Sequence, residues 1–205
     1  MEQILLIGGG GHAKSVADSI RQAGRYRIAG YIDKPELKGE VADGIPFIGT
    51  DSDLQTLYDK GIQNAFVTIG YMGQGNIREA IYESAKRIGF HIPSVTDPAA
   101  ILAEHVKIEE GVYIGKRTVV NAGAAVGKLC IINTGAVVEH DDEIGAFSHV
   151  AVGAVLCGNV SIGKGCLIGA GATVIQGVSI GDGAVIGAGV TVRHDIESGQ
   201  RHYGK

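Results

Sequence analysis

Apolar positions follow one rule up to about residue 95 and a different rule beyond it. In the first part, short apolar runs alternate with stretches whose apolar residues recur every three or four positions, as Val16, Ala17 and Ile20 do. This alternation predicts strands and amphipathic helices in turn. The expected strands are 3–7, 27–32 and 64–69, and the expected helices are 13–23, 51–60, capped by Asp51 or Ser52, and 76–88. We therefore expect a small, mostly parallel α/β domain.

From residue 101 onward the chain repeats every six residues. The second position is Leu, Ile or Val in all 16 hexads from 101 to 196, and the sixth position is small or β-branched almost throughout. One aliphatic residue in six cannot stay on one face of an α-helix, so the period favours short flat strands. With three hexads per turn, coils stacked about 4.8 Å apart would bury two residues per hexad in a narrow core.

This uninterrupted repeat resembles the hexapeptide-repeat family. The resemblance implies a left-handed parallel β-helix, assembly as a homotrimer and transfer of an acyl group from acetyl-CoA or another acyl-CoA. The expected fold class is therefore α/β plus all-β. A small N-terminal Rossmann-like β-α-β domain, residues 1–95, precedes a left-handed β-helix, residues 96–205.

A glycine-rich segment stands between the first expected strand and the first expected helix. Gly8, Gly10 and Ala13 fit the spacing G-x-G-x-x-G/A, and Asp33 follows about twenty residues later. Glycines let a ligand approach the backbone, a helix N-terminus favours an anion, and an acidic residue accepts hydrogen bonds from a ribose or base. Three interpretations stay open: a nucleotide-sugar site, a purely structural turn, and a dinucleotide redox site, which the short α/β part disfavours.

Nearly the whole chain resembles the sugar O- and N-acyltransferases typified by sialic acid O-acetyltransferase and UDP-4-amino-sugar (bacillosamine) N-acetyltransferase. In that group an N-terminal β-α-β domain with a G-x-G-H-type loop binds the nucleotide-sugar. The resemblance implies that the residues that bind the nucleotide-sugar here are Gly10, Gly11, His12, Asp33, Lys34 and Gly70.

A second motif lies in the hexads VVEHDD and EIGAFS, which place a histidine beside carboxylates and break the small-residue rule at Asp142. Acetyl transfer to an amine or hydroxyl needs a base near neutral pH, and a histidine supported by a carboxylate supplies one. The resemblance implies that His140 is this base and that Asp141 raises its basicity. His149, at the first position of its hexad, is expected to point outward. The acetyl-CoA contacts that the resemblance implies are Asn133, His149, Gly158, Ala170 and Ala188.

Composition narrows the class of protein further. The 33 glycines and 5% aromatic residues favour a solenoid over a core of large side chains. A net charge of −4 with scattered Lys and Arg offers no basic face, so we expect no nucleic-acid partner. No apolar run approaches the about 18 residues of a membrane span, and we expect a cytoplasmic protein. Cys130, Cys157 and Cys166 lack a C-x-x-C spacing and are expected to be free, and no metal is expected.

The expected function is acetyl-CoA-dependent acetyl transfer to a nucleotide-linked amino sugar of the UDP-4-amino-4,6-dideoxy-sugar type, directly, with a histidine as general base. The expected partners are the nucleotide-sugar, acetyl-CoA and further copies of the chain. One alternative is a sialic acid O-acetyltransferase. Two alternatives of another class are a γ-carbonic-anhydrase-like zinc enzyme, which needs three converging histidines, and a non-catalytic sugar-binding solenoid.

Overall fold

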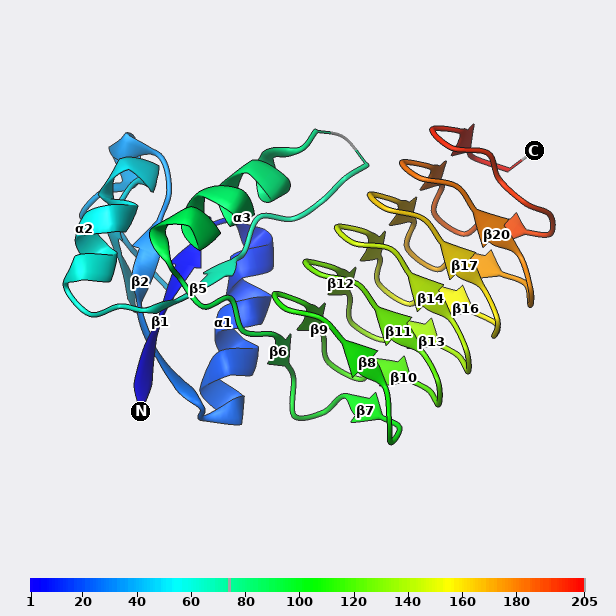
Figure 1. The fold of residues 1–205 in the computed structure, drawn as a ribbon, viewed down its shortest axis with the longest axis horizontal. Helices are drawn as coiled ribbons and strands as arrows, with labels where there is room; N and C mark the ends of the chain where they lie inside the picture. Colours follow the sequence, from blue (N-terminus) through cyan, green and yellow to red (C-terminus); the bar gives the residue numbers. More distant parts are fainter. Residues whose placement is uncertain (74, 205) are drawn as a thin grey trace. The chain divides into compact units, whose positions relative to one another are not determined.

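The structure, a computed structural model, describes residues 1–73 and 75–204. The chain divides into two compact units (Figure 1). The first contains Met1–Gly70 and Asn76–Val95, and the second contains Tyr71–Gly75 and Thr96–Lys205. The short segment Tyr71–Gly75 therefore belongs to the second unit although first-unit residues flank it on both sides. We call this segment the strap.

A five-stranded sheet forms the centre of the first unit, in the order β3-β4-β2-β1-β5. Its strands are β1 (Glu2–Ile7), β2 (Tyr26–Ile32), β3 (Val41–Ala42), β4 (Ile45–Gly49) and β5 (Asn64–Val67). All neighbours pair in parallel except β3 and β4, an antiparallel pair that the sequence pattern did not predict. Because the four longer strands run in parallel, their carboxyl ends meet at one edge of the sheet.

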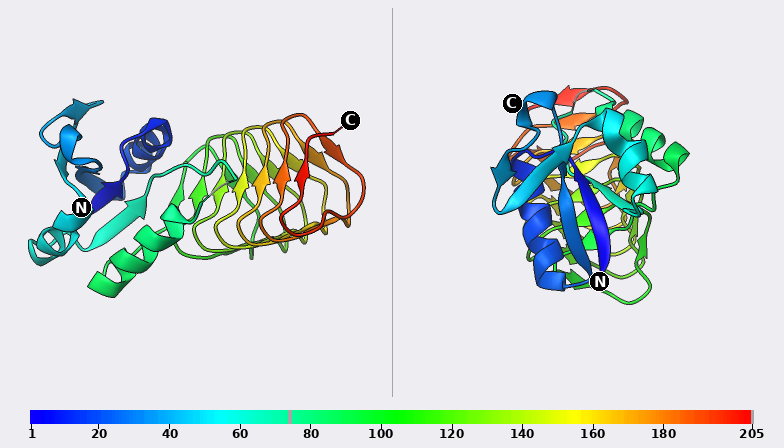
Figure 2. Two further views of the ribbon diagram at one scale, coloured as in Figure 1. Left: turned by 90° about the horizontal axis from the view of Figure 1, so that it is seen from above. Right: turned by 90° about the vertical axis from the view of Figure 1, so that its left-hand side faces the viewer.

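Helices cover both faces of this sheet, with α1 on one face and α2 and α3 on the other (Figure 2). The helical elements are α1 (Gly11–Ala23), η1 (Pro35–Leu37), η2 (Asp51–Asp53), α2 (Leu54–Asp59) and α3 (Ile77–Ile88). The expectation that Asp51 or Ser52 caps the second helix is wrong. A capping box of Thr50 and Asp53 opens the 3₁₀ turn η2, which leads into α2, because a side chain three residues on can reach back to the Thr50 N–H.

The second unit winds two-residue strands into three parallel sheets, which confirms the predicted left-handed β-helix (Figures 1 and 2). The first face contains β7 (Ile101–Leu102), β10 (Val119–Val120), β13 (Val137–Val138), β16 (Val155–Leu156), β19 (Thr173–Val174) and β22 (Thr191–Val192). The second face contains β8 (Lys107–Ile108), β11 (Ala125–Val126), β14 (Glu143–Ile144), β17 (Ser161–Ile162) and β20 (Ser179–Ile180). The third face contains β6 (Val95–Thr96), β9 (Tyr113–Ile114), β12 (Ile131–Ile132), β15 (His149–Val150), β18 (Leu167–Ile168), β21 (Val185–Ile186) and β23 (Arg201–His202).

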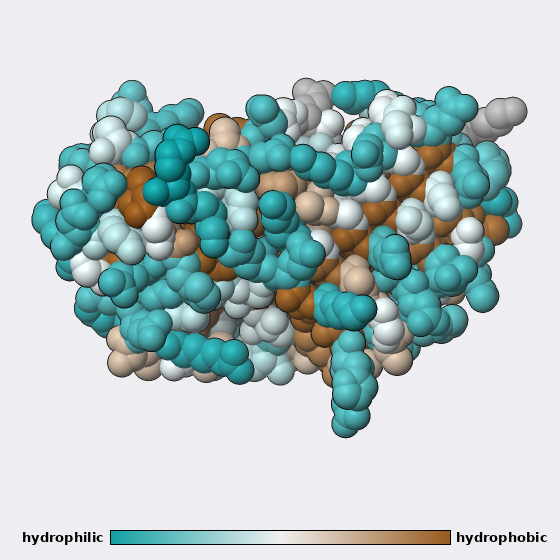
Figure 3. Space-filling view, in the orientation of Figure 1, coloured by the Kyte–Doolittle hydropathy of each residue, from teal (hydrophilic) through white to brown (hydrophobic). Residues whose placement is uncertain are grey.

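Each coil advances the register by 18 residues, so that Val119 pairs with Val137 and Val137 with Val155. The second residue of each strand points into the coil, and residues such as Val120 and Val138 are fully buried. The inward side chain of each strand therefore stacks on the equivalent side chain of the next coil, in rows along the core. On the face shown in Figure 3, apolar residues form a band along the coils, bordered by hydrophilic residues.

The corners follow an equally regular rule. The fifth residue of every hexad from 105 to 189 has a left-handed backbone, with φ between +50° and +77°. Glycine occupies most of these positions because it adopts positive φ without a steric cost. Asp141, with φ +60°, is one of the exceptions.

Small polar residues at the sixth position also bond to the next coil at the same corner. The carbonyl that accepts each of these hydrogen bonds lies 15 residues further along the chain. The pairs are Thr118 Oγ1 with Asn133 O, Cys130 Sγ with Gly145 O, Ser148 Oγ with Gly163 O, and Cys166 Sγ with Gly181 O, at 2.8–3.1 Å. These bonds add a donor to each corner carbonyl, and the carbonyls of Asn133 and Gly181 also accept the N–H groups of Ala136 and Ala184.

Candidate active site

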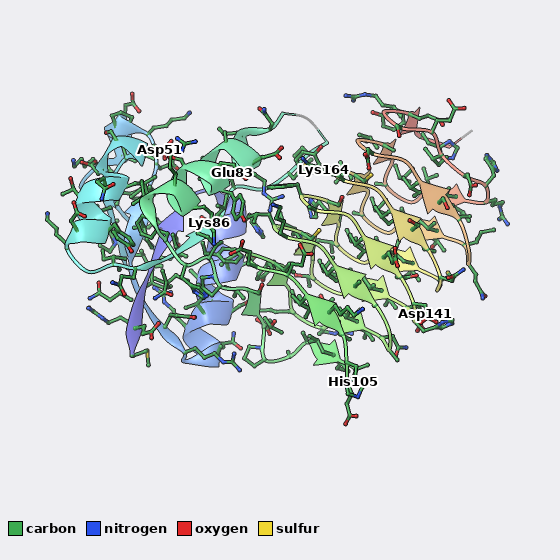
Figure 4. The ribbon with its side chains drawn as sticks, viewed as in Figure 1. Asp51, Glu83, Lys86, His105, Asp141 and Lys164 are labelled. Carbon is green, nitrogen blue, oxygen red and sulfur yellow. The ribbon has the colours of Figure 1, made fainter. Side chains whose placement is uncertain are left out.

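The corner between β13 and β14 carries the His140–Asp141 dyad. Nδ1 of His140 lies 3.0 Å from Oδ2 of Asp141, and the two side chains are 50% and 66% exposed. Figure 4 labels Asp141 at the outer edge of the coils. The carboxylate accepts the Nδ1 proton, which fixes the tautomer and leaves Nε2 as the proton acceptor. The hydrogen bond that His140 donates to Asp141 is the main cause that raises the pKa of His140. The charges of Asp141, Glu139 and Asp142 also raise this pKa, and partial desolvation lowers it.

Asp142 holds the backbone of this corner from inside the β-helix. Its side chain is fully buried; Oδ2 accepts the N–H of Glu139 and Oδ1 accepts the N–H of Val160, each at 2.8 Å. Burial raises the pKa of Asp142 to about 6, so at neutral pH it is the carboxylate that the two N–H groups require. The break in the small-residue rule thus marks a residue that connects the corner of the dyad to the next coil.

The residues predicted to bind the nucleotide-sugar meet at the carboxyl edge of the first sheet. Gly10 and Gly11 are exposed at the N-terminus of α1, and Gly70 follows β5 close to the Cβ of His12. Asp33 and the exposed Lys34 follow β2 at the same edge. The structure therefore brings the whole predicted set to one end of the sheet.

Asp33 is already engaged with the glycine-rich loop. Its Oδ2 accepts the N–H of Gly9 at 2.7 Å, and its Oδ1 accepts the N–H of Lys34 at 2.8 Å. A Cβ at Gly9 would overlap Phe47, so this glycine is required for close packing. Each carboxylate oxygen of Asp33 keeps a second lone pair for a donor on a ligand.

His149 points outward from the coil, as expected, but the strap covers it. Only 7% of the residue is exposed; its Nδ1 donates to Tyr71 O at 2.7 Å and its Nε2 lies 3.1 Å from Asn133 Nδ2. Because Asn133 Oδ1 accepts the N–H of Thr134, the Asn133 amide donates to Nε2 and the imidazole is neutral. Tyr71 also donates its hydroxyl to Gly165 O at 2.7 Å. The sequence offered no signal for this contact, which joins residues 78 positions apart.

The five residues predicted to contact acetyl-CoA fall into two groups. Asn133 and His149 contact each other, and Ala170 and Ala188 are exposed at the same corner of the β-helix, between the third and first faces. Gly158 lies at the next corner, between the first and second faces, against the ring of His140. Within one chain, the width of the first face separates the two groups.

The described residues offer less support for a metal site or for a site elsewhere on the β-helix. Among residues 1–73 and 75–204, no three His, Cys, Asp or Glu side chains converge as metal ligands would, so the geometry gives the zinc-enzyme alternative no support. A hollow of about 390 Å³ over the second face is lined by Lys107, Glu143 and Ser161, and contains no predicted site residue. No helix in the described ranges is long and apolar enough to cross a membrane.

Comparison with known proteins finds a family match in each part of the chain. Residues 3–85 match the PglD N-terminal domain family, and residues 105–139 and 159–193 match the hexapeptide repeat of succinyl-transferase. A histidine-to-alanine variant of GDP-perosamine N-acetyl transferase from Caulobacter crescentus, solved with CoA and GDP-perosamine, is 35% identical. The match covers 98% of this chain and 93% of that one, with a TM-score of 0.92.

A second solved relative is the acetyltransferase domain of PglB from Neisseria gonorrhoeae. It is 34% identical, over 98% of this chain and 96% of that one, with a TM-score of 0.90. The same domain in complex with acetyl coenzyme A matches with the same identity and TM-score, over 98% and 95% of the two chains.

Proposed function

Because the chain belongs to the family of acetyl-CoA-dependent sugar N-acetyltransferases that join a PglD N-terminal domain to hexapeptide repeats, we propose that it acetylates the amine of a nucleotide-linked amino sugar. The observation that carries the proposal is the His140–Asp141 dyad on an exposed corner of the β-helix. A histidine whose Nδ1 proton is held by a carboxylate is a base suited to neutral pH.

In the reaction that we propose, the sugar amine attacks the thioester carbonyl of acetyl-CoA. The new C–N bond forms as the C–S bond breaks, Nε2 of His140 takes the proton from the amine, and that proton then neutralises the departing CoA thiolate. An acetyl-enzyme is not needed. Cys130 and Cys166 are buried, and burial raises the pKa of the Cys166 thiol, which disfavours it as a nucleophile.

The first unit is proposed to hold the nucleotide. Gly10 and Gly11 at the N-terminus of α1 suit an anionic phosphate, since exposed N–H groups and the helix dipole both favour negative charge. Asp33 would accept a donor of the ribose or base with the lone pairs that Gly9 and Lys34 leave available. His12, Lys34 and Gly70 complete the proposed site at this edge.

The proposed acetyl-CoA site involves two copies of the chain. A coenzyme that contacts Gly158 at one corner and Asn133, His149, Ala170 or Ala188 at the other can do so in a groove where corners of neighbouring β-helices meet. The first residues of the strands on the first face point outward and form an apolar row, which we call the outward file. Ile101, which is 65% exposed, begins this file, and Val119, Val137 and Val155 continue it. Such a file supports association between copies of the chain. We therefore propose a homotrimer, in a reducing cytoplasm that suits the three free cysteines.

The test compares two variants in steady-state kinetics with acetyl-CoA and a panel of UDP-, GDP- and dTDP-linked 4-amino sugars. His140→Ala should lower kcat by about 10²–10⁴-fold with little change in the KM for acetyl-CoA. Asp33→Ala should raise the KM for the sugar and leave the KM for acetyl-CoA nearly unchanged.

Two results would contradict the proposal. A wild-type kcat in a folded His140→Ala protein between pH 6 and 9 would show that His140 is not the base. Equal effects of Asp33→Ala on the KM values of both substrates would show that the first unit does not hold the nucleotide. Transfer to a free sialic acid and to none of the nucleotide-sugars would favour the O-acetyltransferase alternative.

A further inference from the structure

The two side chains of the dyad lie against neighbouring coils of the β-helix. His140 lies against Gly158, one coil ahead, where an added Cβ would come within 2.9 Å of Nε2 and 3.1 Å of Cε1. Asp141 lies against Gly123, one coil back, where an added Cβ would overlap Oδ1 of the carboxylate. Because coils are only about 4.8 Å apart, a side chain on either neighbour would fill the space that the dyad uses.

We infer that Gly123 and Gly158 are positioning residues for acetyl transfer, because their missing Cβ atoms leave the space in which Asp141 and His140 meet. The inference rests on the proposed role of His140 as the base. Neither glycine needs to contact the substrate for this role; each acts through the side chain that lies against it.

Backbone geometry alone does not account for Gly123. Gly177 occupies the same corner two coils beyond Asp141, and its φ of +75° nearly equals the +77° of Gly123. A Cβ at Gly177 would meet nothing within 4 Å, whereas a Cβ at Gly123 would meet the catalytic carboxylate. The two glycines thus carry the same conformational strain on substitution and differ in the contact with Asp141.

Gly158 departs from the repeat itself. At this corner the fourth position of the neighbouring hexads holds Ala122, His140 and Gln176, so the coil does not need glycine there. The fifth position of the same hexad, Asn159, already supplies the left-handed residue of the corner, with φ +50°. Gly158 adds a second positive φ, +97°, directly beneath the imidazole.

A Cβ at Gly123 would displace the carboxylate of Asp141, and a Cβ at Gly158 would displace the imidazole of His140. Moving the Asp141 carboxylate from Nδ1 removes the hydrogen bond that contributes most to the raised pKa of His140. The imidazole would then lose both its fixed tautomer and part of its basicity. The inference therefore predicts that turnover and the titration of His140 change together.

The experiment compares Gly123→Ala with Gly177→Ala in the full-length protein. The pKa of His140 is followed by NMR titration of its ring protons, and kcat and both KM values are measured on the same samples. Gly123→Ala should move the pKa of His140 down toward the ordinary histidine value of about 6.5 and lower kcat about tenfold. Gly177→Ala should change neither. Equal effects of the two variants on the pKa of His140 would overturn the inference.

A second pair of variants covers the case in which Gly123→Ala does not fold. Gly158→Ala should displace the His140 ring, alter its titration and lower kcat, while Gly39→Ala, with a φ of +94° and open space around it, should leave both unchanged. An unaltered titration of His140 in Gly158→Ala would contradict its positioning role.

A double-mutant cycle identifies the route of the effect. In an Asp141→Ala background, Gly123→Ala should produce no further change in the pKa of His140, because no carboxylate is left to displace. A further change of the original size would overturn the inference. Failure of the proposed function gives a different result: His140→Ala would then retain activity, whatever the titrations of the glycine variants show.

Discussion

Asp141 combines an unfavourable backbone with a favourable side-chain contact. A non-glycine residue at φ +60° costs on the order of 1 kcal/mol, although aspartate tolerates this region better than most residues. The left-handed backbone of Asp141, directly after His140, places its carboxylate within hydrogen-bond distance of Nδ1 of His140. Strain at this position is thus coupled to the proposed chemistry of the corner.

Asp141→Asn should shift the pH dependence of turnover. The Asp141 carboxylate raises the pKa of His140, and a neutral amide cannot do so, so the substitution lowers that pKa. Because the base works in its neutral form, the acidic limb of the kcat profile should move to lower pH. The plateau kcat should fall by less than in His140→Ala, since a weaker base remains. A pH series of kcat from 5 to 9 measures both effects.

An acidic limb that stays in place or moves upward in Asp141→Asn would show that Asp141 does not set the basicity of His140. Glu139→Gln is the matched control: it also removes one negative charge near His140 but keeps the Nδ1 hydrogen bond. Its limb should therefore move less than that of Asp141→Asn.

The residues of the candidate site could be predicted more readily than the contacts that surround them. His140 with Asp141, and Gly10 with His12, stand together in short motifs, so a linear pattern is enough to find them. Gly123 cannot be distinguished from other corner glycines until the coils are stacked, because its contact with Asp141 is 18 positions away. The cover over His149 comes from the strap, whose residues carry no periodic signal.

At the scale of the element, a corner of the β-helix depends on donors from inside the core. Ser148 shows this most fully: its Oγ donates to Gly163 O at 2.8 Å and accepts the N–H of Cys166 at 2.9 Å. Cys130 and Cys166 stand one coil on either side of it and donate to their own corner carbonyls. This file of small polar side chains joins successive coils where backbone pairing between strands is interrupted.

Ser148→Ala should therefore destabilise the β-helix out of proportion to its size. The change removes one oxygen and leaves both the Gly163 carbonyl and the Cys166 N–H without this partner, which costs about 1–3 kcal/mol. Ser148→Cys keeps a donor of the kind that the neighbouring coils use and should cost less. Urea unfolding of the two variants measures the difference, and a cost for Cys equal to that for Ala would show that the hydrogen bonds are unimportant.

How much of an element could be predicted depended on how often its signal repeats. The hexad pattern occurs sixteen times in succession and fixes both the inward side chains and the corners. The β3–β4 pair and the capping box of Thr50 and Asp53 each occur once, in short polar stretches, and depend on contacts that periodicity does not report. Helix α1 was predictable because Val16, Ala17 and Ile20 share one buried face.

On the scale of the whole molecule, the outward file of the first face should control assembly. Val119→Glu places a charge in the middle of this apolar file and should convert the proposed trimer to monomers, since a buried, unpaired charge costs several kcal/mol. Light scattering at micromolar concentration measures the mass.

Ser161→Glu is the matched control for assembly, because it introduces the same charge at the outward position of a strand on the second face. It should leave the mass unchanged. A monomeric wild-type protein, or a Val119→Glu protein with wild-type mass, would contradict the assembly proposed here.

The 18-residue register also limits how the gene for this protein can change in length. An insertion of 18 residues before Gly123 or after Gly158 adds one complete coil, returns every later residue to its original face and keeps the coils of Gly123, His140 and Gly158 adjacent. Loss or gain of a single hexad between residues 142 and 158 would instead rotate the rest of the chain by one face and remove Gly158 from His140. Related proteins should therefore differ in length by whole coils. A duplication of 18 codons outside this region would lengthen the β-helix and leave the proposed site intact.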